Sequence, residues 1–199
     1  MNNYPLDRKL LQISQNLAVI LLCVLSAGCA SVATTKNTRA LGYTATPGVS
    51  ASAYSVVTVM PFTLGTNVTK ADPKFGENFS GDIVGRLRTD YPGLFREVRW
   101  NKPTSGVDEV VVEGVIRNYH AGSASARLLL IGLGPSTFDG EITLRDAHDG
   151  RVLLTAPFDK LWAWGGMLGA SKTIDHMISE TAVAITKTVA LWKEGKLTK

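Results

Sequence analysis

The chain has 199 residues, which is enough for one domain of ordinary size. Its hydrophobic fraction of 45% and charged fraction of 19% are normal for a folded protein, and they exclude a disordered tail and a multi-span membrane protein. The formal net charge is only +4 and the basic residues are scattered, so the composition argues against nucleic acid as a partner.

The first segment has the pattern of a secretory signal peptide. Arg8 and Lys9 are followed by an uninterrupted apolar run at residues 17–25, which is too short to span a bilayer. The small residues Ser26-Ala27-Gly28 come next, as a signal peptidase requires at its narrow cleft. The pattern predicts a signal peptide over residues 1–28, cleaved between Gly28 and Cys29.

Cysteine usage gives Cys29 a special role. The chain holds two cysteines, and Cys23 leaves with the signal peptide, so Cys29 is the lone thiol of the mature chain. Ala27-Gly28-Cys29 resembles the last three positions of the bacterial lipobox, although Ser26 stands where Leu is commonest. The resemblance implies that Cys29 carries lipid, including palmitate-type acyl chains, which anchor the protein. The alternative is an ordinary signal peptide with an incidental Cys29.

Residue 30 bears on location. In enteric-type lipoproteins an Asp after the lipidated cysteine favours the inner membrane, whereas this chain has Ala30. The resemblance therefore implies an outer-membrane lipid anchor, with the protein facing the periplasm.

Residues 29–53 are predicted to be a lipidated N-terminus and flexible tether. They are rich in Ser, Thr, Ala and Gly and show little apolar periodicity. We therefore expect a deletion of residues 34–50 to leave the domain folded.

The first part of the domain has a strand, a helix and a second strand. Residues 55–62 are rich in Val, which predicts a strand buried on both faces, with Pro61 at its end. Asp72 and Pro73 are typical of a helix start. The apolar stripe of that helix is formed by Phe75, Phe79, Ile83 and Leu87, while Gly76, Gly81 and Gly85 weaken it or bring it close to the sheet. A short strand is predicted at residues 95–100.

The second part predicts three strands and a final helix. Alternation predicts strands over 109–119 and around Ile142 and Leu144, and Asp149-Gly150 predicts a hairpin turn into a strand over 151–164. Ser171 begins the last helix and Gly195 ends it; its buried stripe is Ile174, Ile178, Ile185, Val189 and Trp192. The order predicts a single α+β envelope domain over residues 54–195, with a mainly antiparallel sheet packed by two helices.

Two glycine-rich stretches resemble nucleotide-binding motifs only in part. Gly132-Leu133-Gly134 lacks the third glycine of a dinucleotide loop and precedes a strand. Residues 166–173 differ from a P-loop by Ser171, and only 26 residues follow them. We expect no cofactor.

Neither a metal site nor a catalytic site is predicted. His120, His148 and His176 lie on different elements without ligand spacing. The sequence has no nucleophile-elbow motif. The protein is therefore expected not to be an enzyme, and a hydrolase with an unrecognised site is the weakest alternative.

Two segments are candidate contact surfaces. Residues 121–138, which include Arg127 and Leu133, are either a core strand with a loose turn or an exposed apolar loop that meets a partner. Trp162 and Trp164 share strand parity and either pack at the rim of the core or form a stacking platform for glycan.

The motifs of the domain resemble a family of bacterial lipoproteins of unknown function. The resemblance lies in residues 111–116, Gly122, Arg127, 132–134, Leu144-Arg145-Asp146-Ala147 and 149–153, and it covers about residues 54–193. The opening strand at residues 57–62 is also distantly similar to a group that includes the TolB N-terminal domain, curli-secretion lipoproteins and activators of penicillin-binding proteins. That resemblance implies a small α/β sandwich that binds other envelope proteins.

Three functions follow as expectations, in order of preference. The first is a non-catalytic, outer-membrane-anchored lipoprotein that docks an envelope protein or assists envelope assembly. The second is a glycan- or peptidoglycan-binding module that uses Trp162 and Trp164. The third is the hydrolase.

Overall fold

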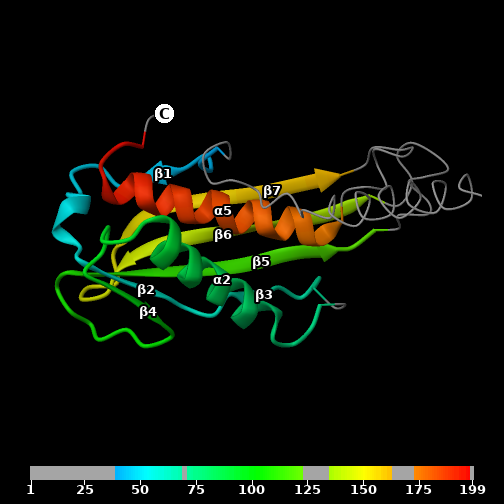
Figure 1. Ribbon diagram of the computed structural model, residues 1–199, viewed down its shortest axis with the longest axis horizontal. Coiled ribbons are helices and arrows are strands. Elements are labelled where there is room, and N and C mark those ends of the chain that lie inside the picture. The colour runs from blue at the N-terminus through cyan, green and yellow to red at the C-terminus, as the bar shows by residue number, and fades with distance from the viewer. Residues whose placement is uncertain (1–38, 69–70, 123–134, 163–172, 198–199) are drawn as a thin grey trace, which may run out of the picture. The chain divides into compact units, whose positions relative to one another are not determined.

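The computed structural model describes residues 39–68, 71–122, 135–162 and 173–197 (Figure 1). In chain order these residues form β1 (Thr44–Ala45), the 3-10 helix η1 (Ala51–Ala53), β2 (Val56–Val59), β3 (Thr63–Leu64), α2 (Phe75–Asp90), β4 (Glu97–Trp100), β5 (Glu109–His120), β6 (Ser136–Asp146), β7 (Val152–Trp162) and α5 (Ile174–Lys193).

The described strands form one sheet in the order β1-β7-β6-β5-β2-β4, with β3 also paired to β5. Long antiparallel ladders join β5 to β6 and β6 to β7. The pairs β2–β4, β2–β5 and β3–β5 are parallel. The α+β class is therefore confirmed, but the sheet is mixed rather than mainly antiparallel. The pair β2–β4 is parallel because α2 returns the chain over the sheet between these strands, as a crossover connection does. The loop between β4 and β5 returns the chain a second time, so β5 also runs parallel to β2.

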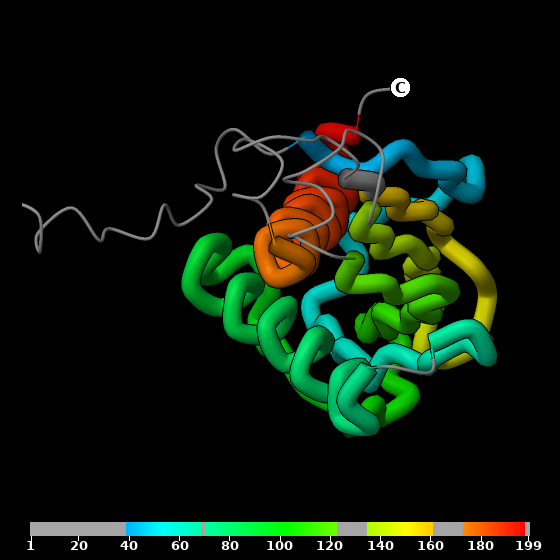
Figure 2. The backbone as a smooth tube through the Cα atoms, turned by 90° about the vertical axis from the view of Figure 1, so that its right-hand side faces the viewer, coloured from blue at the N-terminus to red at the C-terminus, as the bar shows by residue number. Residues whose placement is uncertain are grey.

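Both long helices lie on the same face of the sheet, as the end-on view shows (Figure 2). The apolar stripe predicted for α2 faces the core: Phe79, Ile83 and Leu87 are buried and Phe75 is partly buried against them. In α5, Ile174, Ile185, Val189 and Trp192 are buried and Ile178 packs against the cluster. All four residues of β2 are buried, as its Val content predicted. Among the described residues, no helix is both long and apolar enough to cross a membrane.

Two glycines on inner strand positions make room for phenyl rings. A Cβ at Gly114 of β5 would lie 2.3 Å from the ring of Phe62. A Cβ at Gly140 of β6 would lie 2.1 Å from the carbonyl oxygen of Val115 and 2.5 Å from the ring of Phe158. Both glycines are therefore sterically required, and the rings cover the backbone that a side chain would otherwise cover.

The start of α2 differs slightly from its prediction. The helix begins at Phe75, and Asp72 accepts a hydrogen bond from the backbone N–H of Lys74 at 2.7 Å in the turn before it. Of the three glycines of this helix, Gly76 is the one that approaches another element closely, because its Cβ would lie 2.0 Å from the Phe62 carbonyl oxygen. Gly81 and Gly85 have no such neighbour.

Residues that precede 54, the expected start of the domain, also contact the fold. Residues 44–45 form β1 on the edge of β7, and the Leu41 N–H donates to Thr188 Oγ1 of α5 at 2.9 Å. Leu41, Tyr43, Val49 and Ala51 pack against the core. We call residues 39–53 the N-terminal strap. Its small polar residues lack periodicity because it contacts several elements in turn instead of presenting one face to the core.

Candidate interaction surface

The face of the sheet opposite α2 and α5 carries polar side chains. Burial along β6 alternates strictly: Phe138, Ile142 and Leu144 are buried under the helices, whereas Asp139, Glu141 and Thr143 are partly exposed on the opposite face. Because successive strand residues point to opposite sides, Glu113 and Val115 of β5 share this outer face. We call this side of β5, β6 and β7 the outer face.

Charges on the outer face are paired across strands. Arg145 of β6 donates to Glu113 of β5 at 2.9 Å, and Arg117 lies 3.2 Å from Glu141. The four side chains keep between 34% and 52% of their exposure, so each pair adds at most about 1 kcal/mol to stability. These pairs consequently act mainly as a polar surface and contribute little to holding the fold together.

A hollow opens on the outer face beside these pairs. It has a volume of about 390 Å³ and is bordered by the link from β2 to β3 and by β5 and β6. Its lining comprises Met60, Pro61, Thr63, Glu113, Gly114, Val115, Glu141 and Thr143. Pro61 helps to form the hollow because it ends β2 and lets the chain step away before β3 rejoins β5. The hollow combines an apolar centre with a charged border.

On the same side of the sheet, β2 and the start of β5 are not open to solvent but are covered by the loop between β4 and β5. Glu109 lies beneath this loop with a side chain 1% exposed. It accepts hydrogen bonds from Thr58 Oγ1 at 2.5 Å and from the N–H and Oγ1 of Thr104, both at 2.8 Å. Burial raises the pKa of Glu109, but these hydrogen bonds together outweigh burial and hold its pKa below the ordinary value.

A second buried carboxylate lies at the turn from β6 to β7. Asp146 accepts hydrogen bonds from the Tyr54 hydroxyl at 2.7 Å and from the His148 N–H at 2.8 Å. Burial raises the pKa of Tyr54, and the bond to Asp146 raises it further. The pKa of Asp146 is lowered, because its hydrogen bonds outweigh the effect of burial. In the described part of the chain, every buried side-chain nitrogen or oxygen has a partner.

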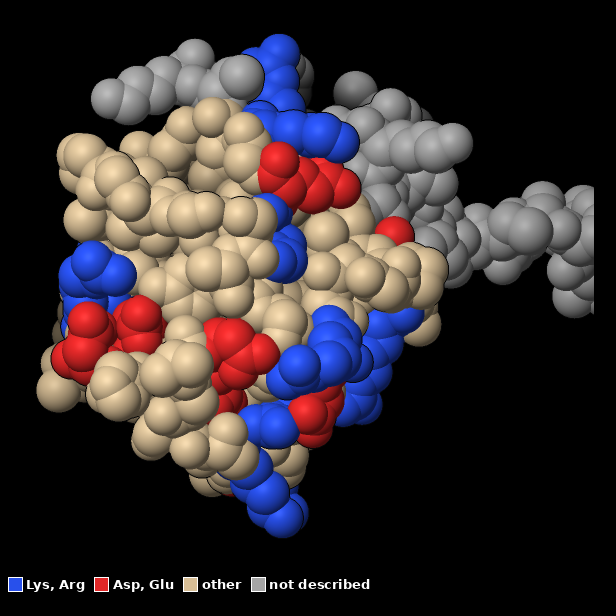
Figure 3. Space-filling model, turned by 90° about the vertical axis from the view of Figure 1, so that its left-hand side faces the viewer, with Lys and Arg blue, Asp and Glu red and all other residues tan. Residues whose placement is uncertain are grey.

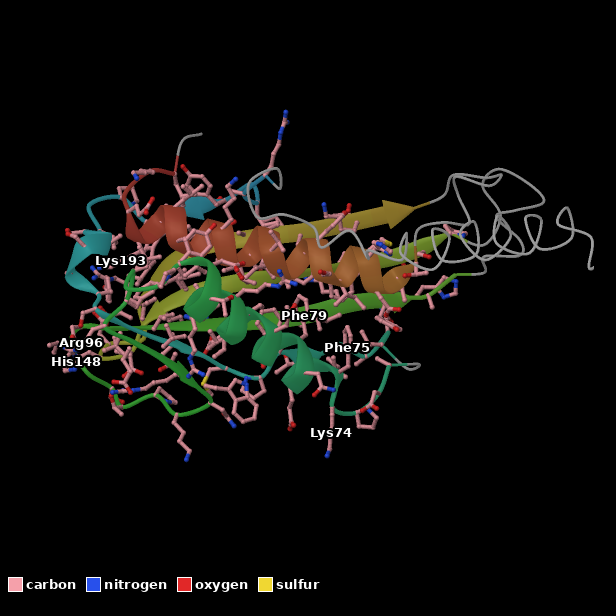
Figure 4. The ribbon with its side chains drawn as sticks, viewed as in Figure 1. Lys74, Phe75, Phe79, Arg96, His148 and Lys193 are labelled. Carbon is pink, nitrogen blue, oxygen red and sulfur yellow. The ribbon has the colours of Figure 1, made fainter. Side chains whose placement is uncertain are left out.

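At this end of the molecule the surface charges of both signs lie side by side (Figure 3). Arg96 and His148 are both labelled at this end of the molecule in the view with side chains (Figure 4). Arg96 pairs with Asp108 at 3.0 Å, and the Ser55 hydroxyl donates to the same carboxylate. The Ser55 bond is the main cause of the lowered pKa of Asp108. The carboxylates at this end of the molecule accept hydrogen bonds or ion pairs from neighbouring residues of the chain, so their role is structural.

Most residues predicted from the sequence as site residues lie outside the described residues. This applies to Gly28, Cys29, Arg127, Leu133 and Trp164, and to most of the segment 121–138. Trp162 ends β7, where its backbone pairs with Ser136. Whether Trp162 and Trp164 form a stacking platform stays a prediction.

The histidines lie on separate elements, as predicted. His120 ends β5, His148 is in the turn between β6 and β7, and His176 is on α5. Within the described ranges, no group of three or more His, Cys, Asp or Glu residues is placed to hold a metal ion.

Sequence reasoning missed the outer-face hollow and the buried Glu109. The alternation of β5 and β6 did place Glu113, Arg117 and Glu141 away from the core. Nothing in the local pattern shows that the link between β2 and β3 borders the hollow, because that requires the parallel pairing of β3 with β5.

These features define a class: an α+β domain whose mixed sheet carries two helices on one face and a polar, hollowed surface on the other. Residues 49–166 match the domain of unknown function DUF4410, and the chain belongs to this family. The resemblance to a family of unknown function is thereby confirmed, whereas the more distant likeness to the TolB and curli-secretion group stays a prediction.

Solved structures resemble the chain in fold. The PelC dodecamer from Paraburkholderia phytofirmans superposes with a TM-score of 0.51 and 14% identity, covering 75% of this chain and 95% of that one. A variant of the same dodecamer gives a TM-score of 0.51 and 15% identity with equal coverage. A lipoprotein from Neisseria meningitidis has a TM-score of 0.39 and 9% identity, covering 68% of this chain and 98% of that one. A search of curated proteins finds no significant match.

Proposed function

We propose that this chain is a non-catalytic lipoprotein of the bacterial cell envelope, anchored through Cys29 in the outer membrane, that docks protein through its outer face. The observation that carries the docking role is the hollow between the β2–β3 link, β5 and β6. Met60, Pro61 and Val115 supply an apolar centre, and ion-paired carboxylates border it. An apolar centre with a polar rim is the usual anatomy of a protein interface.

The partner that we favour is a second copy of this chain. PelC, which shares the fold, is a dodecamer. Docking of copies through the outer face would bury the hollow without unpairing a charge, because Glu113 and Glu141 already have arginine partners within the same chain. Such an assembly would form an envelope scaffold.

Thr143 provides the test because it lines the hollow between the two carboxylates. We expect the mature chain with Cys29→Ser to elute as a multimer, with its mass measured by light scattering. Thr143→Arg should convert it to a monomer with an unchanged thermal transition, because a guanidinium would fill the hollow. The matched control is Thr89→Arg on the exposed side of α2, which should leave the mass unchanged.

Two outcomes would count against this proposal. If the native chain is monomeric and cross-linking in intact envelopes captures no protein, the docking role is wrong. If the chain instead sediments with purified peptidoglycan, the glycan-binding function takes its place.

A further inference from the structure

A second open groove lies between the N-terminal strap and the last turns of α5. Its volume is about 600 Å³. Leu41, Tyr43, Leu191 and Leu197 form its apolar lining, together with Ala40 and Gly42. Figure 2 shows the start of the described chain, in blue, beside the C-terminal segment, in red, at the end of α5.

The charges of this groove have one sign. Of the described residues, Arg39 and Lys187 line it, and no acidic residue does. Within the described part of the chain, neither cation has an ion-pair partner, in contrast to the arginines of the outer face. Apolar walls with unpaired cations at the border fit a surface that offers acyl chains and anionic headgroups.

The position of the groove is fixed by hydrogen bonds of the strap. The Leu41 N–H donates to Thr188 Oγ1 at 2.9 Å, and Thr46 donates to the Val152 carbonyl oxygen at 2.7 Å. Further along the strap, the Lys193 ammonium donates to the Ser52 carbonyl oxygen at 3.0 Å. Arg39, the first described residue, is itself part of the groove lining.

The length of chain between Arg39 and Cys29 limits the distance from the membrane. Residues 30–38 separate the two positions. A stretch of this length spans at most about 35 Å when fully extended. A lipid on Cys29 would therefore be joined to the groove by a short length of chain.

We propose that this groove docks onto an anionic phospholipid surface, with Arg39 and Lys187 contacting lipid phosphates and the leucines meeting the upper acyl region. The inference rests on the proposed lipidation of Cys29, since that anchor brings the groove to the membrane. Docking would fix the orientation of the domain and leave the hollow on β5 and β6 free for a protein.

The test separates the groove from the anchor. The mature chain, residues 29–199 with Cys29→Ser, is mixed with vesicles of phosphatidylcholine that contain about 30% phosphatidylglycerol, which gives them an anionic surface. Binding is measured by sedimentation. Each cation near such a surface contributes about fivefold in affinity. We therefore expect Arg39→Gln/Lys187→Gln to weaken binding about thirtyfold.

The matched control is Lys74→Gln/Lys102→Gln, which removes the same charge from exposed positions outside the groove (Lys74 is labelled in Figure 4). It should bind as the parent chain does. Equal weakening by both pairs, no dependence on phosphatidylglycerol, or no vesicle binding by the parent would overturn the inference. A change in oligomeric mass without a change in vesicle binding would assign the groove to a second copy instead and also overturn it.

A second measurement uses the acylated full-length protein in the same vesicles. A fluorescent probe attached to Leu191→Cys should be quenched by a quencher carried on lipid, whereas a probe on Glu113→Cys, beside the hollow of the outer face, should not. Equal quenching at both positions overturns the docked orientation. Failure of acylation at Cys29 would remove the proposed anchor, but it would leave the vesicle result of the unacylated chain intact, so the two failures are distinguishable.

Discussion

At the scale of single residues, Glu109 shows how a buried charge is held by hydrogen-bond donors. Glu109→Gln would turn an amide group toward the donors of Thr104, and we expect it to lower the free energy of unfolding at pH 7 by about 2 kcal/mol. Urea denaturation measures this loss. Glu77→Gln, on an exposed position of α2, is the control and should have little effect.

The pH dependence of the same variant is a separate prediction. Because the pKa of Glu109 is lowered in the folded protein, its contribution is present above the unfolded pKa and is lost as pH falls through the folded pKa. The stability difference between parent and Glu109→Gln should therefore shrink below about pH 4.3. A difference that is constant down to pH 2 would contradict the assigned role.

Gly140 gives a steric prediction at the residue scale. Gly140→Ala would place its Cβ 2.1 Å from the Val115 carbonyl oxygen, and backbone cannot move aside cheaply. We expect a loss of about 3 kcal/mol in unfolding free energy. Gly81→Ala is the matched control: nothing lies within 4 Å of its Cβ, and helix propensity predicts a gain of up to about 1 kcal/mol. Equal effects of the two variants would show that Gly140 is not sterically required.

At the scale of elements, the N-terminal strap is the largest departure from the sequence prediction. Two threonines of α5 test its attachment: Thr188 and Thr186 are both buried, and both donate to the carbonyl four residues earlier. Thr188 alone of this pair also accepts the Leu41 N–H. Thr188→Val should cost about 1 kcal/mol more than Thr186→Val.

Hydrogen exchange gives the strap prediction a local measurement. The Leu41 amide should exchange faster in Thr188→Val and at the parent rate in Thr186→Val. The strap also reverses our expectation for the deletion of residues 34–50, which would remove β1 and several core contacts. That deletion should now lower the melting temperature, and an unchanged transition would restore the tether interpretation for this segment.

The elements that were predicted well are those whose own periodicity decides their structure. The stripes of α2 and α5 and the alternation of β5 and β6 are local patterns, and burial follows them. Parallel pairing of β2 with β4 depends on the crossover through α2, and its pairing with β5 depends on the return loop between β4 and β5; no local pattern encodes either connection. For the same reason the partners of Glu109, which lie on β2, on β4 and in the loop before β5, could not be foreseen.

At the scale of the whole molecule, the two proposed surfaces lie on different elements. The hollow belongs to the outer face of β5 and β6, and the groove belongs to the strap and the end of α5. A domain that meets lipid through one surface and protein through the other can hold an assembly at a fixed height above a membrane. Both roles depend on where the chain is anchored.

The anchor itself can be tested by comparing the two cysteines of the chain. Cys29→Ser should leave the precursor unprocessed and without acyl label, because the thiol sulfur is the atom that accepts lipid in the proposed chemistry. Cys23→Ser changes the apolar run of the predicted signal peptide and should be processed and labelled normally. Growth with a palmitate analogue, followed by mass spectrometry of the mature N-terminus, distinguishes the two. A Cys29→Ser protein that still matures and fractionates with membranes would show that something other than this thiol holds the domain there.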